Sequence, residues 1–569
     1  MKIPARIKEW PWWLLLAGLL ALAFYAVNAA HYGQLPLRIE EGEWPPMAEA
    51  VYETAEPTIE AGETRRIRFE EDLSVDESPF VGAWHPPLYI YAIGVATAFV
   101  GTDSPQALRG VGALGLLAAA LLLILIAREV TPRWRLVGGV AAILLLLHPF
   151  AIQGSLFLDI DNSIYAPLAL LAIWLAIRYG QREAPLSGGQ ILAIGAALAL
   201  VTWAKMTSTT VLIAAIVLWW LLSRRPPRRA ALECAAFLAV GAILFTSTYG
   251  LWCVVTGIPF SYTFDVTFAG KSNRLLSEWW LVENAVHWHL RWLGPAVILL
   301  TLVYAVDMVR RFAAERKPHP LDLPFLFAVG VLIFYVGLSP TDGTYQGKYA
   351  IPALVALLLP LSWLLLREPR PLGRPALWAA AVAVGVVAAL VMPDLLTGLA
   401  FGGYGSWGYD LKVTALAGAA LGLAWLLGGR AGFGGGVIVV LAVLLIAQAA
   451  RSYDAETSPL YPVPDTGDFR AVLHDLNEDT GPRDVVVVPK DVGFYVDRLI
   501  VEGEDALARG DERLARAIRH YPRITAFARD SFGPPIGPAT QAVLERCFRD
   551  ERVYGTAVVM HRTSRCARP

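Results

Sequence analysis

The chain has 569 residues, of which 56% are hydrophobic and 17% charged, and its formal net charge at pH 7 is −1. This composition excludes a soluble multidomain protein and indicates a chain that crosses a membrane several times. The absence of surplus positive charge argues against a nucleic-acid partner, because binding to a phosphate backbone needs clustered lysine and arginine.

The first predicted element is a transmembrane helix. Basic residues (Lys2, Arg6 and Lys8) precede an apolar run over 12–30. This run of about 19 residues is long enough to span a bilayer and longer than the apolar core of a typical signal peptide. We therefore predict an uncleaved first helix rather than a cleaved signal.

Further apolar runs of helix length follow along the chain. They cover 109–127, 136–152, 163–178, 190–204, 208–223, 231–255, 291–309, 324–338, 349–366, 376–396, 411–427 and 433–450. The segment 87–100, of about 14 residues, is short for a span and suits a re-entrant or interfacial helix. If it does not span, every predicted cytoplasmic connection contains arginine, as the positive-inside rule requires. The sequence thus predicts about 13 transmembrane helices, a cytoplasmic N-terminus and an extracytoplasmic C-terminus.

This orientation gathers polar residues on the external side. They are Glu40, Glu41 and Glu43 in the loop 31–86, His85, Arg109, Asp159, Asp161, Lys205, Lys348 and Tyr349. A second external loop covers 256–290 and contains the "HWH" sequence (287–289), for which an interfacial helix and a zinc site are the alternatives. We find no internal repeat, which weakens an inverted-repeat transporter as an interpretation.

The C-terminal region becomes charged from about residue 452. "DVVVVP" and "TAFA" are typical of buried strands, "DFRAVLHDLNEDTG" and "TQAVLERCF" of amphipathic helices, and "VYGTAVVMHR" of a last strand. The sequence therefore predicts a transmembrane domain over 1–451 and a small extracytoplasmic α/β domain over 452–569. Cys547 and Cys566 are either a disulfide, which an oxidising compartment favours, or two thiols.

Carboxylates and basic side chains on one face indicate a transfer reaction. A carboxylate can deprotonate an acceptor hydroxyl, and lysine or arginine can neutralise a phosphate that departs. Because a phosphate is a stable anion, such a reaction needs one base and no general acid. Together these groups predict sugar transfer from a lipid-phosphate donor.

An ordered set of segments resembles a known family. The set is "EEGEWPPMAEAV", "HPPLY", "ALRGVGALGLLAAALLLILIAREV", "SLFLDIDNSIYAPLALLAIWLAIR", "ALVTWAKMTS" and "GKYAIPALVALLLPLSWLL". It resembles the GT-C glycosyltransferases, above all the bacterial branch related to dolichyl-phosphate-mannose protein mannosyltransferases and lipid A aminoarabinose transferases. The resemblance extends from residue 1 to about 366 and implies an all-α polytopic GT-C fold and inversion at the anomeric carbon.

The resemblance implies roles for the acidic residues. Glu40 stands where the family has a catalytic aspartate, and Glu41 matches the acidic residue after it. Because glutamate is one methylene longer than aspartate, Glu43 and Asp161 are alternatives for the base. Asp159 or Asp161 matches the second acidic motif of the family, although both are also suited to capping a helix near Ser163.

The resemblance also implies a donor-binding set. It consists of His85 before Pro-Pro, Arg109, Lys205, and Lys348 with Tyr349. For the two lysines the alternative is that they extend from helix ends toward the membrane surface. For Arg109 it is an ordinary boundary charge, but an outward-facing arginine opposes the bias toward cytoplasmic basic residues and favours an anionic partner.

We expect no cofactor. The carboxylates of Glu40, Glu41, Asp159 and Asp161 are hard oxygen ligands, so Mg²⁺ or Mn²⁺ is the alternative if their loops converge.

The sequence thus predicts a hexosyl- or pentosyltransferase of the bacterial cytoplasmic membrane. It would use a polyprenyl-phosphate sugar and a protein, lipid or cell-envelope glycan acceptor, with the segments 31–86, 87–100 and 256–290 above the cavity and the lipid tail between helices. Alternatives are a transporter or flippase, an oligosaccharyltransferase-like enzyme and a non-catalytic scaffold. The "WWDYG" sequence of oligosaccharyltransferases is absent, "SWGYD" at 406–410 being the nearest string.

Overall fold

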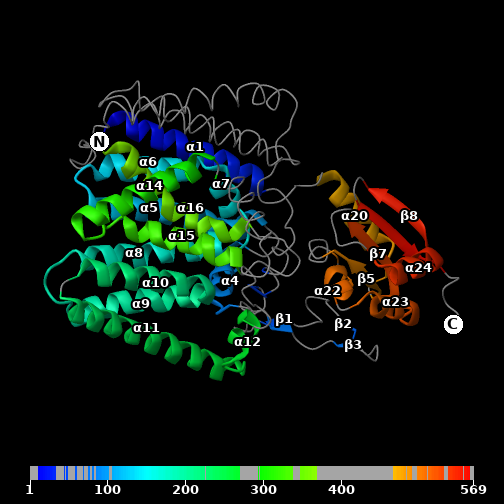
Figure 1. Cartoon of the computed structure of the whole chain (residues 1–569). Coiled ribbons are helices and arrows are strands. Elements are labelled where there is room, and N and C mark those ends of the chain that lie inside the picture. Colours follow the sequence, from blue (N-terminus) through cyan, green and yellow to red (C-terminus); the bar gives the residue numbers. More distant parts are fainter. Residues whose placement is uncertain are drawn as a thin grey trace. The chain divides into compact units, whose positions relative to one another are not determined.

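A computed structural model of the chain is shown in Figure 1. It describes residues 11–33, 85–100, 105–224, 226–268, 295–337, 347–367, 466–481, 483–489, 498–508, 510–530, 536–554 and 557–563, with a few short stretches between them. The chain divides into two compact units. One comprises 1–30, 84–86 and 112–461, and the other 31–83, 87–111 and 462–569.

Helices form over every predicted apolar run that the structure describes. The described helices before the C-terminal region, including α12 within the predicted loop 256–290, are α1 (Trp12–Gly33), α4 (Leu88–Val100), α5 (Pro105–Val130), α6 (Trp134–Leu147), α7 (Pro149–Ser155), the π-helix η3 (Asp161–Tyr165), α8 (Ala166–Gly180), α9 (Gly188–Ala204), α10 (Met206–Ser223), α11 (Pro227–Thr256), α12 (Tyr262–Phe268), α14 (Pro295–Glu315), α15 (Asp322–Gly337), the 3₁₀ helix η4 (Gly347–Ala350) and α16 (Ile351–Leu366).

Five of the described helices are long and apolar enough to cross a membrane. They cover Trp12–Ala30, Leu108–Val130, Ser163–Gly180, Met206–Ser223 and Pro227–Thr256. The predicted runs 376–396, 411–427 and 433–450 lie outside the described residues, so the count of about 13 stays a prediction. The length and apolar composition of these five helices nevertheless indicate a multi-pass membrane protein.

The segment 87–100 forms the 13-residue helix α4. A helix of this length rises about 20 Å, less than the roughly 30 Å of the bilayer core. Its length therefore agrees with a helix that does not span. In the predicted loop 31–86, the structure describes two short antiparallel pairs, β1 (Thr58–Ile59) with β4 (Phe80–Val81) and β2 (Arg68–Phe69) with β3 (Val75–Asp76).

Two glycines let α5 approach the backbone around η3. A Cβ at Gly112 would lie 2.0 Å from the carbonyl oxygen of Ser155, and one at Gly115 would lie 1.8 Å from that of Ser163. Real Cβ atoms do not come this close, so only glycine fits at either position. The placement of η3, which begins at Asp161, thus depends on the absence of side chains at Gly112 and Gly115 of α5.

The C-terminal residues form a five-stranded sheet with flanking helices. Its order is β6-β5-β7-β9-β8. The strands β6, β5 and β7 are parallel to one another, and β9 is antiparallel to both of its neighbours, β7 and β8. The strands are β5 (Val485–Val488), β6 (Leu499–Glu502), β7 (Ile524–Asp530), β8 (Phe548–Tyr554) and β9 (Ala557–Arg562), and the helices α20 (Thr466–Glu478), α22 (Gly503–Ala508), α23 (Asp511–His520) and α24 (Pro538–Cys547).

The strand β5, which lies between β6 and β7, is buried on both faces, which explains its uninterrupted valines. Val485 and Val487 pack in one core with Leu514 of α23, whereas Val486 and Val488 pack in another with residues of α20. Alternate side chains of a strand point to opposite faces, so a strand covered on both sides needs no polar residue. The domain boundary at 451/452 and the external location of this region stay predictions.

The single last strand predicted for 553–562 is wrong. The segment contains the end of β8 and all of β9, which pair as an antiparallel hairpin with Val553 opposite Val558. The apolar pattern continues across the reversal and hides it, although Gly555 was a signal for a turn.

Cys547 is disulfide-bonded, and its predicted partner, Cys566, lies outside the described residues. Cys234 and Cys253 are free thiols.

Candidate functional site

A buried ion pair joins two residues that the sequence analysis selected. The ammonium of Lys205 contacts Oδ2 of Asp161, and their side chains are 3% and 0% exposed. Asp161 opens η3, which leads into α8, and Lys205 lies between α9 and α10. The pair therefore connects the beginning of one helix with the junction of two others.

Lys205 is the one residue that separates α9 from α10. Its backbone is extended (φ −159°, ψ 112°), and it ends α9 while preceding the first residue of α10. Its N–H donates to the carbonyl of Val201 at 2.9 Å, and the hydroxyl of Thr209 donates to its carbonyl at 2.5 Å. These bonds satisfy the backbone at the break. Because its side chain is buried against Asp161, Lys205 does not extend to the membrane surface as the alternative supposed.

Asp159 shapes the turn that leads into η3. Its Oδ1 accepts a hydrogen bond from the N–H of Asp161 at 3.0 Å, and the hydroxyl of Ser163 donates to its carbonyl. Both of these bonds of Asp159 are local, whereas Asp161 pairs with a residue 44 positions away. The π-helical turn that begins at Asp161 is itself a feature often found at functional sites.

Two stacked tyrosines lie against the Lys205 ammonium. The ring centroids of Tyr335 and Tyr349 are 4.3 Å apart with an interplanar angle of 6°. The Nζ atom of Lys205 lies 4.3 Å from the centroid of Tyr349 and 5.5 Å from that of Tyr335. Both distances are within the range of a cation–π interaction. The ammonium thus has a carboxylate and two aromatic rings around it.

The structure brings four of the predicted site residues together, namely Asp159, Asp161, Lys205 and Tyr349. Sequence reasoning missed Tyr335, because a tyrosine near the end of the apolar run "LFAVGVLIFYVG" carries no distinguishing signal.

The other predicted residues are placed as follows. His85 is half-buried just before α4, and Arg109 is buried in the first turn of α5. Arg109 belongs to the second unit, so its place relative to Lys205 stays a prediction. Lys348 falls in η4 beside Tyr349, but its side chain is not among those described. Glu40, Glu41, Glu43 and the "HWH" sequence lie outside the described residues.

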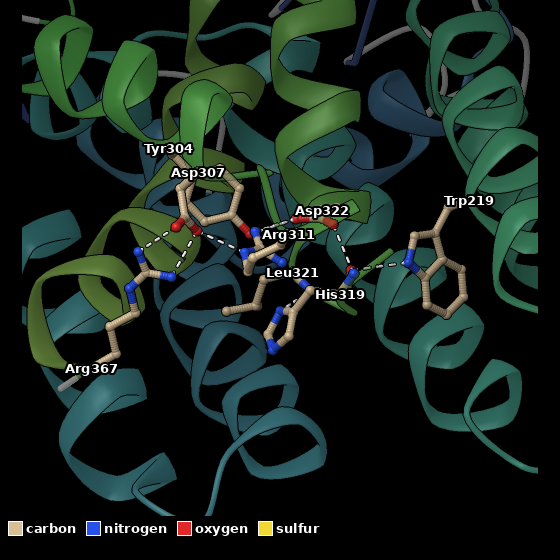
Figure 2. Close-up of polar contacts among 8 residues, drawn as sticks. All are labelled: Trp219, Tyr304, Asp307, Arg311, His319, Leu321, Asp322 and Arg367. Atoms are coloured by element: carbon tan, nitrogen blue, oxygen red, sulfur yellow. Dashed lines mark hydrogen bonds and ion pairs between the residues drawn. The ribbon is translucent and has the colours of Figure 1, made fainter. Parts of the chain in front are cut away.

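A second buried polar network ties α10, α14, α15 and α16 together (Figure 2). Asp322 accepts hydrogen bonds from the Tyr304 hydroxyl (2.9 Å), from Nη2 of Arg311 (2.8 Å) and from the N–H of His319 (2.7 Å). Asp307 accepts from Nε of Arg311 at 2.7 Å, and from Nη1 and Nη2 of Arg367 at 2.7 and 2.5 Å.

Charge balance distinguishes this network from a ligand site. Two aspartates face two arginines, and burial, together with the neighbouring Arg311 and Arg367, lowers the pKa of His319 to about 3. His319 is therefore neutral at pH 7. The indole N–H of Trp219 donates to the carbonyl of His319 at 3.2 Å, which attaches the end of α10. A neutral, mutually bonded group of this kind fixes helices relative to one another.

A third cluster lies in the C-terminal sheet. Asp475 of α20, Asp479 and His561 of β9 are close enough to share a metal ion. However, Nη1 of Arg552 bonds to both carboxylates, at 2.6 Å to Asp475. The guanidinium already supplies the positive charge that a metal would bring, so we assign this cluster to the docking of α20 on the sheet.

Comparisons with known proteins address the fold and family. Residues 84–252 match the family model of the dolichyl-phosphate-mannose-protein mannosyltransferases. Among solved structures, ArnT from Cupriavidus metallidurans bound to undecaprenyl phosphate is similar, with a TM-score of 0.56 and 15% identity over 98% of this chain and 99% of that chain. The chain has the GT-C glycosyltransferase fold. The matched segment contains Asp159, Asp161 and Lys205.

A second GT-C structure is also similar. It is the archaeal oligosaccharyltransferase AglB from Archaeoglobus fulgidus in complex with an inhibitory peptide and a dolichol-phosphate, with a TM-score of 0.51 and 12% identity over 99% of this chain and 75% of that chain. No curated protein matches the sequence. The resemblance to GT-C glycosyltransferases predicted from the ordered motifs is confirmed by the fold and by the family model over residues 84–252.

Proposed function

We propose that this GT-C protein transfers a hexosyl or pentosyl group from a polyprenyl-phosphate-linked monosaccharide to a protein, lipid or cell-envelope glycan on the outer face of a bacterial cytoplasmic membrane. The observation that carries the proposal is the buried Asp161–Lys205 pair inside the family-matched segment. The donor class is supported by the similar structures, since that ArnT holds undecaprenyl phosphate and that AglB a dolichol-phosphate.

Lys205 is assigned to the phosphate of the donor. As the bond between sugar and phosphate breaks, negative charge develops on the departing phosphate, and a fixed ammonium in a site shielded from water stabilises that charge. His85, Arg109, Lys348 and Tyr349 are proposed as further donor-binding residues. Their contribution would be to orient the phosphate so that the anomeric carbon is open to attack.

Glu40 is assigned as the base. Oδ2 of Asp161 is already engaged by Lys205, so we assign Asp161 the task of holding that lysine. Proton abstraction from the acceptor hydroxyl then falls to Glu40, with Glu41 next to it in the chain. A single direct displacement of the phosphate inverts the anomeric carbon. No cofactor is required by this scheme, and a divalent cation is the alternative that a chelator would reveal.

The test is sugar transfer by the purified protein in nanodiscs with a panel of polyprenyl-phosphate monosaccharides and of protein, lipid and glycan acceptors. We expect donor turnover by the wild type and a loss of about 10²- to 10⁴-fold in kcat for Glu40→Gln, as for removal of a general base. Glu183→Gln, at an exposed acidic residue between α8 and α9, is the matched control.

Two outcomes would reject the proposal. If no donor is consumed, a transporter, a flippase or a scaffold becomes the better interpretation. If Glu40→Gln transfers sugar as the wild type does, the base lies elsewhere. Turnover that stops with EDTA and returns with Mg²⁺ or Mn²⁺ would instead establish the metal-dependent alternative.

A further inference from the structure

We infer that Tyr335 is a positioning residue, whose ring holds the Lys205 ammonium at Asp161. Nothing in the sequence selected Tyr335, and the inference begins from its contacts on two sides. Its ring faces the ammonium at 5.5 Å and stacks on Tyr349, which lies closer at 4.3 Å. The importance of this arrangement for the donor rests on the proposed function.

The hydroxyl of Tyr335 ties the ring to α10. It is hydrogen-bonded to the hydroxyls of Ser208 at 2.5 Å and of Thr207 at 3.2 Å. These two residues belong to the first turn of α10, directly after Lys205. Tyr335 therefore contacts both the charged end of the lysine and the helix turn that follows its backbone, so that ring and ammonium are held by the same short segment.

The helix that carries Tyr335 is also fixed at its other end. α15 begins at Asp322, which bonds to Tyr304, Arg311 and the backbone of His319 (Figure 2). Thirteen residues later it presents Tyr335 to Lys205. A helix attached at both ends leaves its side chains little freedom to shift, which makes the tyrosine ring a stable surface for the ammonium.

The aromatic rings suit this position because Lys205 pairs with Asp161 and, in the proposed function, also binds the phosphate of the donor. A long side chain with four rotatable bonds would have many conformations in a cavity. The ring faces attract the ammonium without neutralising its charge. Hence the rings restrict the lysine without adding negative charge, whereas a second carboxylate beside Asp161 would give the pair a net negative charge and oppose an anionic donor.

The first experiment measures how accessible Lys205 is to a small amine-acylating reagent, by mass spectrometry of the full-length protein in nanodiscs. Tyr335→Met keeps a large apolar side chain but removes the ring. We expect at least tenfold faster acylation of Lys205 in Tyr335→Met than in the wild type, and a much smaller rise in Tyr335→Phe, which keeps the ring and loses only the hydrogen bonds of the hydroxyl. Tyr249→Met is the matched control, since Tyr249 is also buried and its hydroxyl donates to that of Thr263 at 2.7 Å.

The same variants are then compared in donor KM and kcat. A higher donor KM in Tyr335→Met than in Tyr249→Met, rescued by Tyr335→Phe, supports the inference in full. Faster acylation without any donor turnover in the wild type would leave the positioning of Lys205 standing and reject the proposed function. Acylation in Tyr335→Met that equals that in Tyr249→Met would overturn the inference.

A second series keeps the fold even if Tyr335→Met is unstable. Phenylalanine carrying one, two or three fluorines at position 335 has nearly the same shape, but its ring face becomes progressively less attractive to a cation. We expect acylation of Lys205 to rise with each fluorine, by about twofold to fivefold across the series. A flat series would show that the ring face does not hold the ammonium.

Discussion

Asp161 and Lys205 lie 44 positions apart in the chain, yet their side chains meet where both are buried, at 0% and 3% exposure. Removal of one partner from such a pair leaves an uncompensated charge in the interior, whereas removal of both does not. We therefore expect Lys205→Met alone to lower the free energy of unfolding by about 3–5 kcal/mol. The double variant Asp161→Asn with Lys205→Met should recover most of that loss.

Thermal unfolding of the four proteins of this cycle in nanodiscs is the measurement. Arg178 and Glu129 supply the control pair, because they are 39% and 28% exposed and 3.9 Å apart. Breaking a pair of this kind should cost less than about 1 kcal/mol. Equal losses for both pairs would show that the Asp161–Lys205 contact does not carry the expected energy.

The close approach of α5 to η3 predicts a strong effect of one methyl group. In Gly115→Ala the new Cβ would meet the carbonyl oxygen of Ser163, 1.8 Å away. The backbone around Asp161 must then shift, and we expect a loss of about 1–3 kcal/mol from overpacking, together with reduced activity. Gly110→Ala in the same helix, where nothing lies within 4 Å, is the control. A melting temperature of Gly115→Ala that equals that of Gly110→Ala would contradict this packing.

The histidine between α14 and α15 predicts a dependence of stability on pH. Burial and the neighbouring arginines lower the pKa of His319 from 6.5 to about 3. The unfolded chain therefore binds a proton at this residue more readily than the folded chain, so stability is complete above about pH 6.5 and falls as the pH drops toward 3.

Between pH 7.5 and pH 5 the loss due to His319 should be about 2 kcal/mol. Comparing the unfolding of wild type and His319→Gln at the two pH values isolates this contribution. The variant should lose less stability than the wild type over the interval. An identical loss in both proteins would mean that His319 is not the group responsible.

A fourth prediction concerns the docking of α20. The buried carboxylate of Asp475 bonds to Arg552 at 2.6 Å, to the Tyr554 hydroxyl at 3.0 Å and to His561 at 3.0 Å. Asp475→Ala removes all three bonds and leaves Arg552 with Asp479 alone, so we expect a loss of about 1–3 kcal/mol. Limited proteolysis should detect release of α20.

Asp479→Ala provides the control, because Asp479 is exposed and bonds to the same Arg552. It should leave the proteolysis pattern as in the wild type. The same measurement after addition of Zn²⁺ or Mg²⁺ tests the alternative assignment of the cluster, since protection by a metal would show that Asp475, Asp479 and His561 bind one.

The helices of the first unit were predictable because their apolar runs are longer than any competing pattern. The runs at 190–204 and 208–223 correspond to α9 and α10 within two residues. The pairing of Asp161 with Lys205 was not predictable, because no helical or strand period relates residues on different helices. Tyr335 was missed for a related reason, since its role depends on Tyr349 and Lys205 being brought to it by the fold. In the C-terminal region, the reversal between β8 and β9 was hidden by apolar residues on both sides of it.

The position of the ion pair also has a consequence for synthesis of the chain in the membrane. α8 and α9 pack against each other as a hairpin, with Asp161 just before α8 and Lys205 just after α9. Both charges thus lie at the open end of one hairpin. They can neutralise each other once α9 has left the ribosome, before α15 and α16 exist. The open end of the nascent hairpin would then enter lipid without a net charge, and a chain in which this pair fails to form would present an unpaired charge to the membrane at the earliest stage of assembly.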